Sequence, residues 1–398
     1  PEWLSILPLK SLNLASNQLN SFPNKIGNLD ALKELNLSNN LLEALPATLG
    51  IPQILQVLDL SWNRLKKLPE TFGHLTQLVK LNLSNNQLQT LPASFGNLND
   101  LKELYLSWNH LRNLPSSFSR LTNLQILSLA NNQLKSLPPL FPQLTNLHTL
   151  NLGSNQLVSL PETFGQLTQL VKLKLHNNLL GILPASFGGL TNLVELWLGY
   201  NQLRILPRSF GNLIMLQTLD LSWNQLRALP ASCGKLTRLE GLSLGYNHLK
   251  ALPSSFANLG NLQALNLNHN HLKAFPASLG SLSNLHTLNL KKNQLKTLPR
   301  SFGNLTKLQN IGLSWNQLRV LPESFGNLNS LQELNLNQNQ LKVLPPSFRN
   351  LENLEILKLE HNQLQTLPEM SKSLKELYLY GNPLKILPKS LKIIATRE

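Results

Sequence analysis

The stretch Leu216-Gln-Thr-Leu219-Asp-Leu221-Ser-Trp-Asn224-Gln-Leu226-Arg-Ala-Leu229-Pro230 decides the fold, because its pattern returns along the chain at a constant period. The asparagines equivalent to Asn224 stand 23 residues apart, except that the last one follows after 20. They number 17 and are Asn17, Asn40, Asn63, Asn86, Asn109, Asn132, Asn155, Asn178, Asn201, Asn224, Asn247, Asn270, Asn293, Asn316, Asn339, Asn362 and Asn382. A fixed period of this length is the signature of a solenoid, in which each repeat packs against its neighbours.

Each part of the repeat predicts a local structure. Leu219-Asp-Leu221 alternates with period two, so its leucines face one side of a short strand, and stacked repeats form a parallel sheet. The asparagine amide both donates and accepts hydrogen bonds, which suits it to the backbone groups of the turn after the strand. The Leu229-Pro230 pair fixes an extended backbone and prevents a long helix, so we expect an irregular return with short 3₁₀ turns.

Every phenylalanine falls at one of two positions of the repeat, which predicts that all of them are core residues. Phe22 and Phe275 replace the leucine before the proline. The others form a predicted spine on the convex side: Phe72, Phe95, Phe118, Phe141, Phe164, Phe187, Phe210, Phe256, Phe302, Phe325 and Phe348. Cys233 occupies the same spine position, so we expect a buried, inert thiol.

The whole repeat, LxxLxLxxNxLxxLPxxFGxLxx, resembles the leucine-rich-repeat family over essentially the whole chain. The 23-residue form is similar to the Ras-group type and to bacterial repeats, including the recognition blocks of Roco GTPases. The 20-residue step through Leu367-Pro-Glu-Met-Ser-Lys-Ser-Leu374 resembles the shorter repeat of bacterial effector proteins. The resemblance implies an α/β-type solenoid, a right-handed superhelix or horseshoe-shaped arc, with a parallel β-sheet on its concave face and a mostly irregular and 3₁₀ convex side.

The resemblance also implies a function and a location. Such proteins recognise protein partners, often as one part of a larger regulated enzyme. The location would be the bacterial cytoplasm, or a host cell into which a bacterium delivers the protein. The chain departs from the Roco proteins because it has no nucleotide-binding motif, so a GTPase part would lie outside it.

We expect residues 1–398 to form a single domain of 17 repeats, covering about 7–388. Short caps at 1–8 and 389–398 would cover the ends, through Trp3, Ile6 and Leu7 at one end and Leu391, Ile393 and Ile394 at the other. Such short caps suggest flanking domains outside this chain.

Composition narrows the class of protein. Hydrophobic residues make up 42% and charged ones 14%, so the chain can build a long core. No run of 18 apolar residues is present, so no membrane span is expected, and the start resembles no signal peptide. The single cysteine cannot form an internal disulfide, which favours a reducing compartment.

Aromatic side chains mark the candidate binding face. We expect function to lie on the non-leucine strand positions and on the residue before each asparagine, which together line the concave face. The candidate partner-binding residues are Trp62, Tyr105, Trp108, Glu195, Trp197, Tyr200, Asp220, Trp223, Tyr246 and Trp315. Tryptophan and tyrosine are enriched among binding hot spots. The alternative is that neighbouring rings stack as a structural ladder.

We place the centre of the face at Trp197, Tyr200, Trp223 and Tyr246, where small neighbours should keep the rings accessible. Those small neighbours are Gly199, Ser222 and Gly245.

A second feature is basic and follows one edge of the repeats. It comprises Lys66, Arg112, Lys135, Arg204, Arg227, Lys250, Lys273, Lys296, Arg319, Lys342 and Lys385, and it explains much of the net charge of +15. Such a field would attract an acidic protein partner, or alternatively a polyanion, nucleic acid or membrane surface. A solvated position of no function is the other interpretation.

Acidic residues on the concave face argue against a nucleic-acid partner. They are Glu34, Asp59, Glu103, Glu195, Asp220, Glu333, Glu360 and Glu376.

No motif in the chain predicts catalysis. There is no GxGxxG, GxxxxGK[ST], HExxH or zinc-spaced cysteine pair. His248 and His271 occupy equivalent positions near His269 and would need a further ligand to hold a metal. We therefore expect a non-enzymatic protein with no cofactor and no metal.

Overall fold

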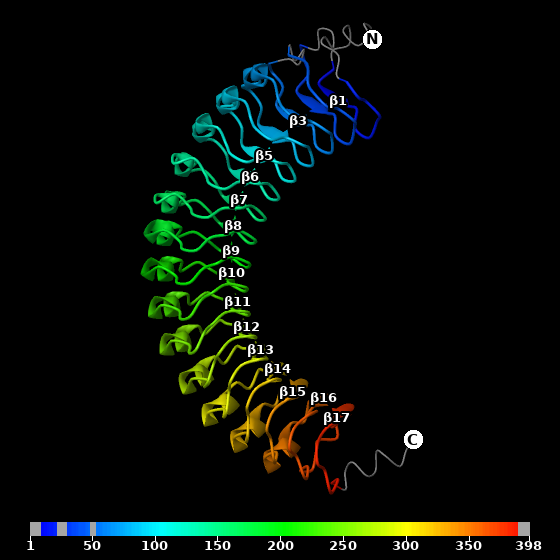
Figure 1. Ribbon diagram of the computed structural model, residues 1–398, viewed down its shortest axis with the longest axis vertical. Helices are drawn as coiled ribbons and strands as arrows, with labels where there is room; N and C mark the ends of the chain where they lie inside the picture. The colour runs from blue at the N-terminus through cyan, green and yellow to red at the C-terminus, as the bar shows by residue number, and fades with distance from the viewer. Residues whose placement is uncertain (1–8, 22–29, 48–52, 389–398) are drawn as a thin grey trace. The chain divides into compact units, whose positions relative to one another are not determined.

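The computed structural model describes residues 9–21, 30–47 and 53–388, which fall into two compact units, Pro1–Gln202 (unit 1) and Leu203–Glu398 (unit 2). In each unit, short strands line the concave side and 3₁₀ helices the convex side (Figure 1). That all repeats form one domain stays a prediction. The expected caps, including Trp3 and Leu391, and the core residue Phe22 lie outside the described residues.

Unit 1 repeats the order of strand, turn and 3₁₀ helix. Its strands are β1 (Ser11–Asn13), β2 (Glu34–Asn36), β3 (Val57–Asp59), β4 (Lys80–Asn82), β5 (Glu103–Tyr105), β6 (Ile126–Ser128), β7 (Thr149–Asn151), β8 (Lys172–Lys174) and β9 (Glu195–Trp197). Its 3₁₀ helices are η2 (Glu70–His74), η3 (Ala93–Asn97), η4 (Ser116–Arg120), η5 (Phe141–Gln143), η6 (Phe164–Gln166) and η7 (Ala185–Gly189).

Unit 2 continues with the same elements. Its strands are β10 (Thr218–Asp220), β11 (Gly241–Ser243), β12 (Ala264–Asn266), β13 (Thr287–Asn289), β14 (Asn310–Gly312), β15 (Glu333–Asn335), β16 (Ile356–Lys358) and β17 (Glu376–Tyr378). Its 3₁₀ helices are η8 (Arg208–Asn212), η9 (Ala231–Lys235), η10 (Ser254–Asn258), η11 (Ala277–Ser281), η12 (Arg300–Asn304), η13 (Glu323–Asn327) and η14 (Pro346–Asn350).

Within each unit the strands pair in parallel with a register of one repeat. Leu81 lies opposite Leu104 in unit 1, and Leu219 opposite Leu242 in unit 2. The register shortens to 20 residues only between β16 and β17, where Leu357 lies opposite Leu377. The predicted solenoid with a parallel sheet and 3₁₀ return is therefore confirmed within each unit.

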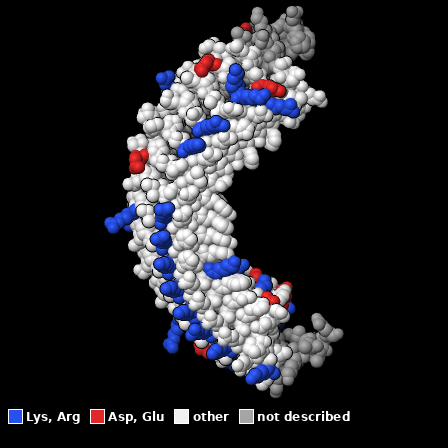
Figure 2. Space-filling model, in the orientation of Figure 1, with Lys and Arg blue, Asp and Glu red and all other residues white. Residues whose placement is uncertain are grey.

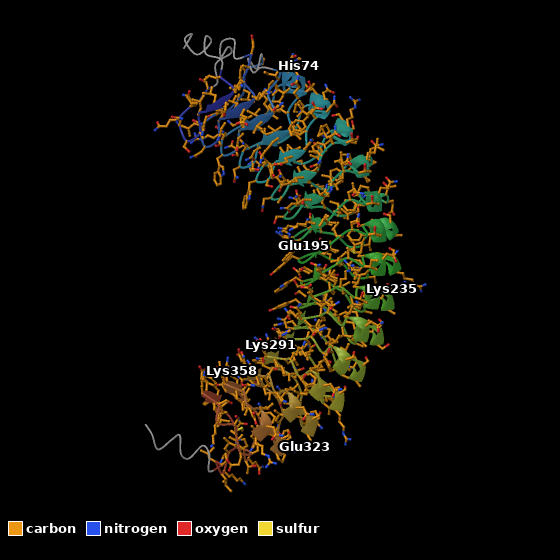
Figure 3. All side chains as sticks on the ribbon, turned by 180° about the vertical axis from the view of Figure 1, so that it is seen from behind. His74, Glu195, Lys235, Lys291, Glu323 and Lys358 are labelled. Carbon is orange, nitrogen blue, oxygen red and sulfur yellow. The ribbon has the colours of Figure 1, made fainter. Side chains whose placement is uncertain are left out.

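The middle residue of each strand points into the core, and its two neighbours point to the sheet face. Leu196 is fully buried between Glu195 and Trp197, which are half-buried. Figure 3 shows the two sides in unit 2: Lys291 and Lys358 come from the strand side, and Lys235 and Glu323 from the side of the 3₁₀ helices. The alternation predicted from the sequence is thus present.

The ladder asparagines from Asn40 to Asn362 are buried and satisfied by the backbone, as predicted, whereas Asn17 is exposed and Asn382 is half-buried. Asn247 is 3% exposed. Its Nδ2 donates to the carbonyls of Leu221 (2.9 Å) and Leu244 (3.1 Å), and its Oδ1 accepts from the amide of Leu226 (3.0 Å). Each asparagine therefore ties its own turn to the preceding repeat. A buried amide without these partners would be costly, which explains why the position is uniform.

Proline sets the start of most 3₁₀ helices. Pro92 holds an extended ψ of 155°, and its carbonyl accepts from the amide of Phe95 at 3.1 Å. Phe95 then stacks on Phe72 and Phe118, with ring centroids 6.1 and 6.2 Å apart. The predicted phenylalanine spine is thus confirmed for the described residues of each unit.

Cys233 interrupts the spine in unit 2. It is buried, as expected, beside a cavity of about 10 Å³ whose lining includes Leu229 and Phe256. Burial raises the pKa of the thiol to about 12, so the reactive thiolate is absent near neutral pH.

Candidate recognition surface

The residue before each ladder asparagine lies in a left-handed turn. These residues stand outside the strands, and that they line the concave face together with the strand positions stays a prediction. The strands are three residues long, so Trp223 lies three residues beyond the end of β10. Its φ is +54°, and the non-glycine residues at this position have φ between +51° and +59°. The turn repeats because the chain must leave the sheet in the same way in every repeat.

Large rings at this turn position are exposed. Their exposed fractions are 63% for Trp62, 60% for Trp108, 54% for Tyr200, 51% for Trp315 and 42% for Trp223. A left-handed backbone costs most L-residues about 1–2 kcal/mol, and asparagine tolerates it best. Asparagine does stand at this position in four repeats of unit 1, at Asn39, Asn85, Asn131 and Asn177. An exposed tryptophan there gains little for folding.

A polar network lies on the sheet face of unit 1, on β4 and β5. The Lys80 Nζ lies 3.0 Å from a Glu103 carboxylate oxygen and 5.7 Å from the Tyr105 ring centroid. The Tyr105 hydroxyl donates to Glu103 at 3.1 Å. Hydrogen bonding and charge attraction from Glu103 raise the pKa of Lys80, while burial and then the bond to Glu103 raise the pKa of Tyr105. The network holds Tyr105 in place.

Other acidic residues of the sheet face are also engaged. Asp59 accepts from the amide and hydroxyl of Ser61 at 2.8 and 2.6 Å and from Asn82 at 3.2 Å. Glu195 lies 2.8 Å from the Nζ of Lys172. In unit 2, the amide of Ser222 donates to Asp220 at 2.9 Å. These contacts leave a face of both charges rather than a uniformly acidic one.

The rings of unit 2 form a stack. Trp223 and Tyr246 lie parallel with centroids 3.7 Å apart, and Tyr246 and His269 follow at 3.9 Å. Lys292 then lies 5.6 Å from the Trp315 ring centroid. The structural ladder of stacked rings, the alternative to a binding role, is therefore present in this unit. It covers both faces of the Tyr246 ring.

Of the three rings that follow Gly199, Ser222 and Gly245, Tyr200 and Trp223 are exposed and Tyr246 is half-buried in the stack. A side chain at Gly245 would collide with Oδ1 of Asn268, so the small residue makes room for the next repeat. Trp197 and Tyr200 belong to unit 1, and Trp223 and Tyr246 to unit 2. The four-residue centre therefore stays a prediction.

Three buried polar atoms were not foreseen from the sequence. Trp197 Nε1, Asn268 Oδ1 and His269 Nδ1 have no hydrogen-bond partner among the described residues. Burial, followed by the charges of Lys292 and Lys291, lowers the pKa of His269. No sequence signal marks these atoms, because their burial depends on how side chains of adjacent repeats overlap.

All residues of the predicted basic edge are exposed. Lys66 lies 3.3 Å from Glu43, whereas none of the edge residues from Arg204 to Lys342 forms a salt bridge with a described residue. Figure 2 shows a column of basic side chains along unit 2.

The histidines form no metal site that the described residues can complete. The rings of His248 and His271 stack in parallel, 5.5 Å apart, and no group of three metal-ligating side chains is present among the described residues. Within the same part of the chain, no helix has the length and apolar character needed to cross a membrane.

Family models match most of the chain. The model described as a leucine-rich repeat region matches residues 3–111 and 254–340. A second model, described as leucine rich repeats (2 copies), matches residues 122–166. A third, described as a leucine rich repeat, matches 176–226, 224–272, 319–364 and 330–384. No curated protein matches this chain.

Solved structures with the same fold come from several organisms. A leucine-rich-repeat protein of Leptospira interrogans is 37% identical, with a TM-score of 0.80 over 98% of this chain and 93% of that one. In the Drosophila Toll–Spätzle complex, the similar chain is 27% identical, with a TM-score of 0.77 over 91% of this chain and 52% of that one. An Arabidopsis receptor-kinase ectodomain in complex with CASPARIAN STRIP INTEGRITY FACTOR 2 is 29% identical, with a TM-score of 0.55 over 96% of this chain and 60% of that one.

Proposed function

Since this chain belongs to the leucine-rich-repeat family, whose members are commonly non-catalytic scaffolds for protein recognition, we propose that it binds a protein partner through exposed rings beside its sheet face. The rings that we assign to contact are Trp62 and Trp108 in unit 1 and Trp315 in unit 2. The partner is a folded protein or peptide, and the chain itself performs no chemistry on it.

The main support for this proposal is that tryptophan side chains are exposed at a left-handed turn. Trp62 and Trp108 stay 63% and 60% exposed at φ of +55° and +59°. Their positions could hold asparagine, as the neighbouring repeats do at Asn39, Asn85 and Asn131. Exposed tryptophan contributes large contact area with few rotatable bonds and is enriched at binding hot spots. Contact with a partner gives these rings a role that folding does not.

The polar network on β4 and β5 supports the same surface, because Trp108 follows β5 in the chain. Lys80, Glu103 and Tyr105 are held by mutual contacts, so little side-chain entropy is lost when a partner covers them. A polar rim around aromatic contacts is typical of protein interfaces. Two of the similar structures contain ligands, Spätzle bound to Toll and the integrity factor bound to the plant receptor, which supports a protein or peptide partner.

Capture from lysate of the source cells tests the proposal. The wild type is compared with a Trp62→Asn/Trp108→Asn variant, in which both residues take the side chain of neighbouring repeats. The matched control is Val158→Asn/Ile182→Asn, which removes two apolar side chains that are each 59% exposed. Both lie on what we call the loop edge of unit 1, the segment between a ladder asparagine and the following Leu-Pro pair.

A protein retained by the wild type and the control, but lost from the tryptophan variant, supports the proposal. Nuclease treatment should leave this retention unchanged. Equal retention by all three proteins, or retention abolished by nuclease, would overturn the assignment of the tryptophans.

A further inference from the structure

Unit 2 carries an uninterrupted row of cations, here called the cationic stripe. It comprises Arg204, Arg227, Lys250, Lys273, Lys296, Arg319 and Lys342, one in each of seven consecutive repeats. All seven side chains are exposed, and none forms a salt bridge with a described residue. The row is visible as the basic column of unit 2 in Figure 2. Seven like charges in neighbouring repeats repel one another, so the stripe does not stabilise the fold.

The fold does not require a cation at this position. In unit 1 the equivalent residues include Glu43, Gln89, Val158 and Gly181, in repeats with the same strands and the same asparagine ladder. Gln365 occupies the position in unit 2 just after the stripe. Snorkelling over the core would apply equally to every repeat, so it does not explain why the cations gather in one unit.

Polar side chains flank the stripe on one side and orient the arginines. The Arg204 Nε donates to Gln225 Oε1 at 3.4 Å, and the Arg319 Nε donates to Gln340 Oε1 at 3.3 Å. Glutamine carries no charge, so it orients both guanidinium groups without neutralising them. A planar guanidinium presented in this way suits bidentate binding of a carboxylate.

The residues that follow the stripe residues flank it on the other side, and all but one of them are aliphatic. This aliphatic column comprises Ile205, Ala228, Ala251, Ala274, Thr297, Val320 and Val343. Its large members, Ile205, Val320 and Val343, stand toward the two ends and are 64%, 50% and 55% exposed. At one end, Arg204, Ile205, Gln225, Arg227, Ala228 and His248 line a shallow groove of about 500 Å³. The stripe therefore offers charge and apolar contact side by side.

We propose that the cationic stripe binds an extended acidic peptide in which Asp or Glu alternates with aliphatic residues. The rings of His248 and His271, in the column beside the stripe, lie 5.5 Å apart. Side chains on one side of an extended peptide repeat at about 6.8 Å, which long lysine and arginine side chains can match. The stripe spans roughly 30 Å, the length of about ten extended residues. This surface is separate from the sheet face and does not depend on the function proposed above.

The aliphatic column favours a peptide over nucleic acid. A phosphate backbone would use only the cations, and it would leave Ile205, Val320 and Val343 without a role. An alternating peptide places its carboxylates on the stripe and its aliphatic side chains toward the column. Burial of that apolar surface adds affinity that salt does not screen.

Fluorescence anisotropy with a labelled ten-residue Glu-Val peptide tests the proposal. The Arg227→Gln/Lys250→Gln/Lys273→Gln variant should bind about tenfold more weakly, since each exposed ion pair contributes a factor of up to about five. The matched control, Lys66→Gln/Arg112→Gln/Lys135→Gln in unit 1, loses the same charge and should change affinity less than about twofold. Glutamine is native to this position at Gln89 and Gln365, so both variants should fold.

Two further probes separate the kinds of ligand. An Ile205→Ser/Val320→Ser/Val343→Ser variant should weaken the Glu-Val peptide several-fold and leave a Glu-Ser peptide unchanged. Equal loss from the unit 1 and unit 2 charge variants would overturn the proposal, as would failure of the wild type to bind the peptide. Tighter binding of a ten-nucleotide single-stranded DNA than of the peptide, insensitive to the aliphatic variant, would also overturn it.

Discussion

The two units share the same repeat backbone and differ in the residues at the positions that core packing does not fix. Both have three-residue strands, buried ladder asparagines and left-handed turns. At the turn, unit 1 alternates tryptophan with asparagine, as at Trp62, Asn85 and Trp108, so each ring stands alone. Unit 2 places Trp223, Tyr246 and His269 in consecutive repeats, and the rings stack. The core repeat determines the fold, and the spacing of rings along it determines whether they are available to a partner.

The largest expected effect should be the same in both units. Replacing Asn86 in unit 1 or Asn247 in unit 2 with leucine leaves one buried amide without its partner and removes one of the two asparagine donors from each of two buried carbonyls. Each variant should lose about 3 kcal/mol or more of unfolding free energy, because the unpaired amide costs about 1–3 kcal/mol and each of the two other lost hydrogen bonds about 1 kcal/mol. Urea unfolding followed by circular dichroism measures this. A loss confined to one unit would show that the two ladders are not equivalent.

The next largest effect is expected when the phenylalanine and the cysteine of the spine are exchanged between the units. Phe118→Cys in unit 1 should cost about 2–4 kcal/mol, slightly less than a phenylalanine-to-alanine change. Cys233→Phe in unit 2 should raise the stability, because it restores the stacked ring that most repeats carry at this position. The neighbouring side chains must move to admit the ring, since the cavity of about 10 Å³ holds only about one water molecule. Thermal unfolding of both variants gives the two signs. A destabilised Cys233→Phe variant would mean that the neighbouring repeats have closed around the cysteine.

Asparagine substitutions at the turn address the difference between the units directly. Trp62→Asn should leave stability unchanged or raise it by up to about 1 kcal/mol, because asparagine accepts the left-handed backbone more readily. Tyr246→Asn should instead lower it by about 1 kcal/mol, because the stack with Trp223 and His269 is lost. Paired urea titrations measure both changes. Equal destabilisation by the two variants would contradict the distinction between isolated and stacked rings.

The smallest effect is a pH dependence specific to unit 2. The folded chain lowers the pKa of His269, whereas in the unfolded chain that pKa is near 6.5. On acidification through pH 6.5 the unfolded chain takes up the proton first, so stability from His269 is present above this pH and declines below it. The difference in stability between the wild type and His269→Asn should therefore shrink as the pH falls from 8 to 5. A difference that stays constant with pH would contradict this assignment.

The fold was predictable because its signals are local and repeated. Leucine alternation, the ladder asparagine and the Leu-Pro pair each predicted an element that the structure contains. The stacking of Trp223 on Tyr246 also had a signal, since rings at one position of adjacent repeats lie about one strand spacing apart. The left-handed turn was missed because hydrophobic periodicity says nothing about φ at a single turn residue, and tryptophan and lysine at this position do not favour positive φ. The Asn268 side chain lies where a Cβ at residue 245 would stand. This contact has no signal in the sequence, because it depends on the rotamer of Asn268.

Site-specific photocrosslinking tests the central claim that the exposed turn rings contact a protein partner. A photoreactive phenylalanine analogue would replace Trp62, Trp108 or Trp315, and as a control Ile182 on the loop edge. The account predicts that the captured partner crosslinks from the three turn positions and not from position 182. Crosslinking from position 182 with none from the turns would contradict it.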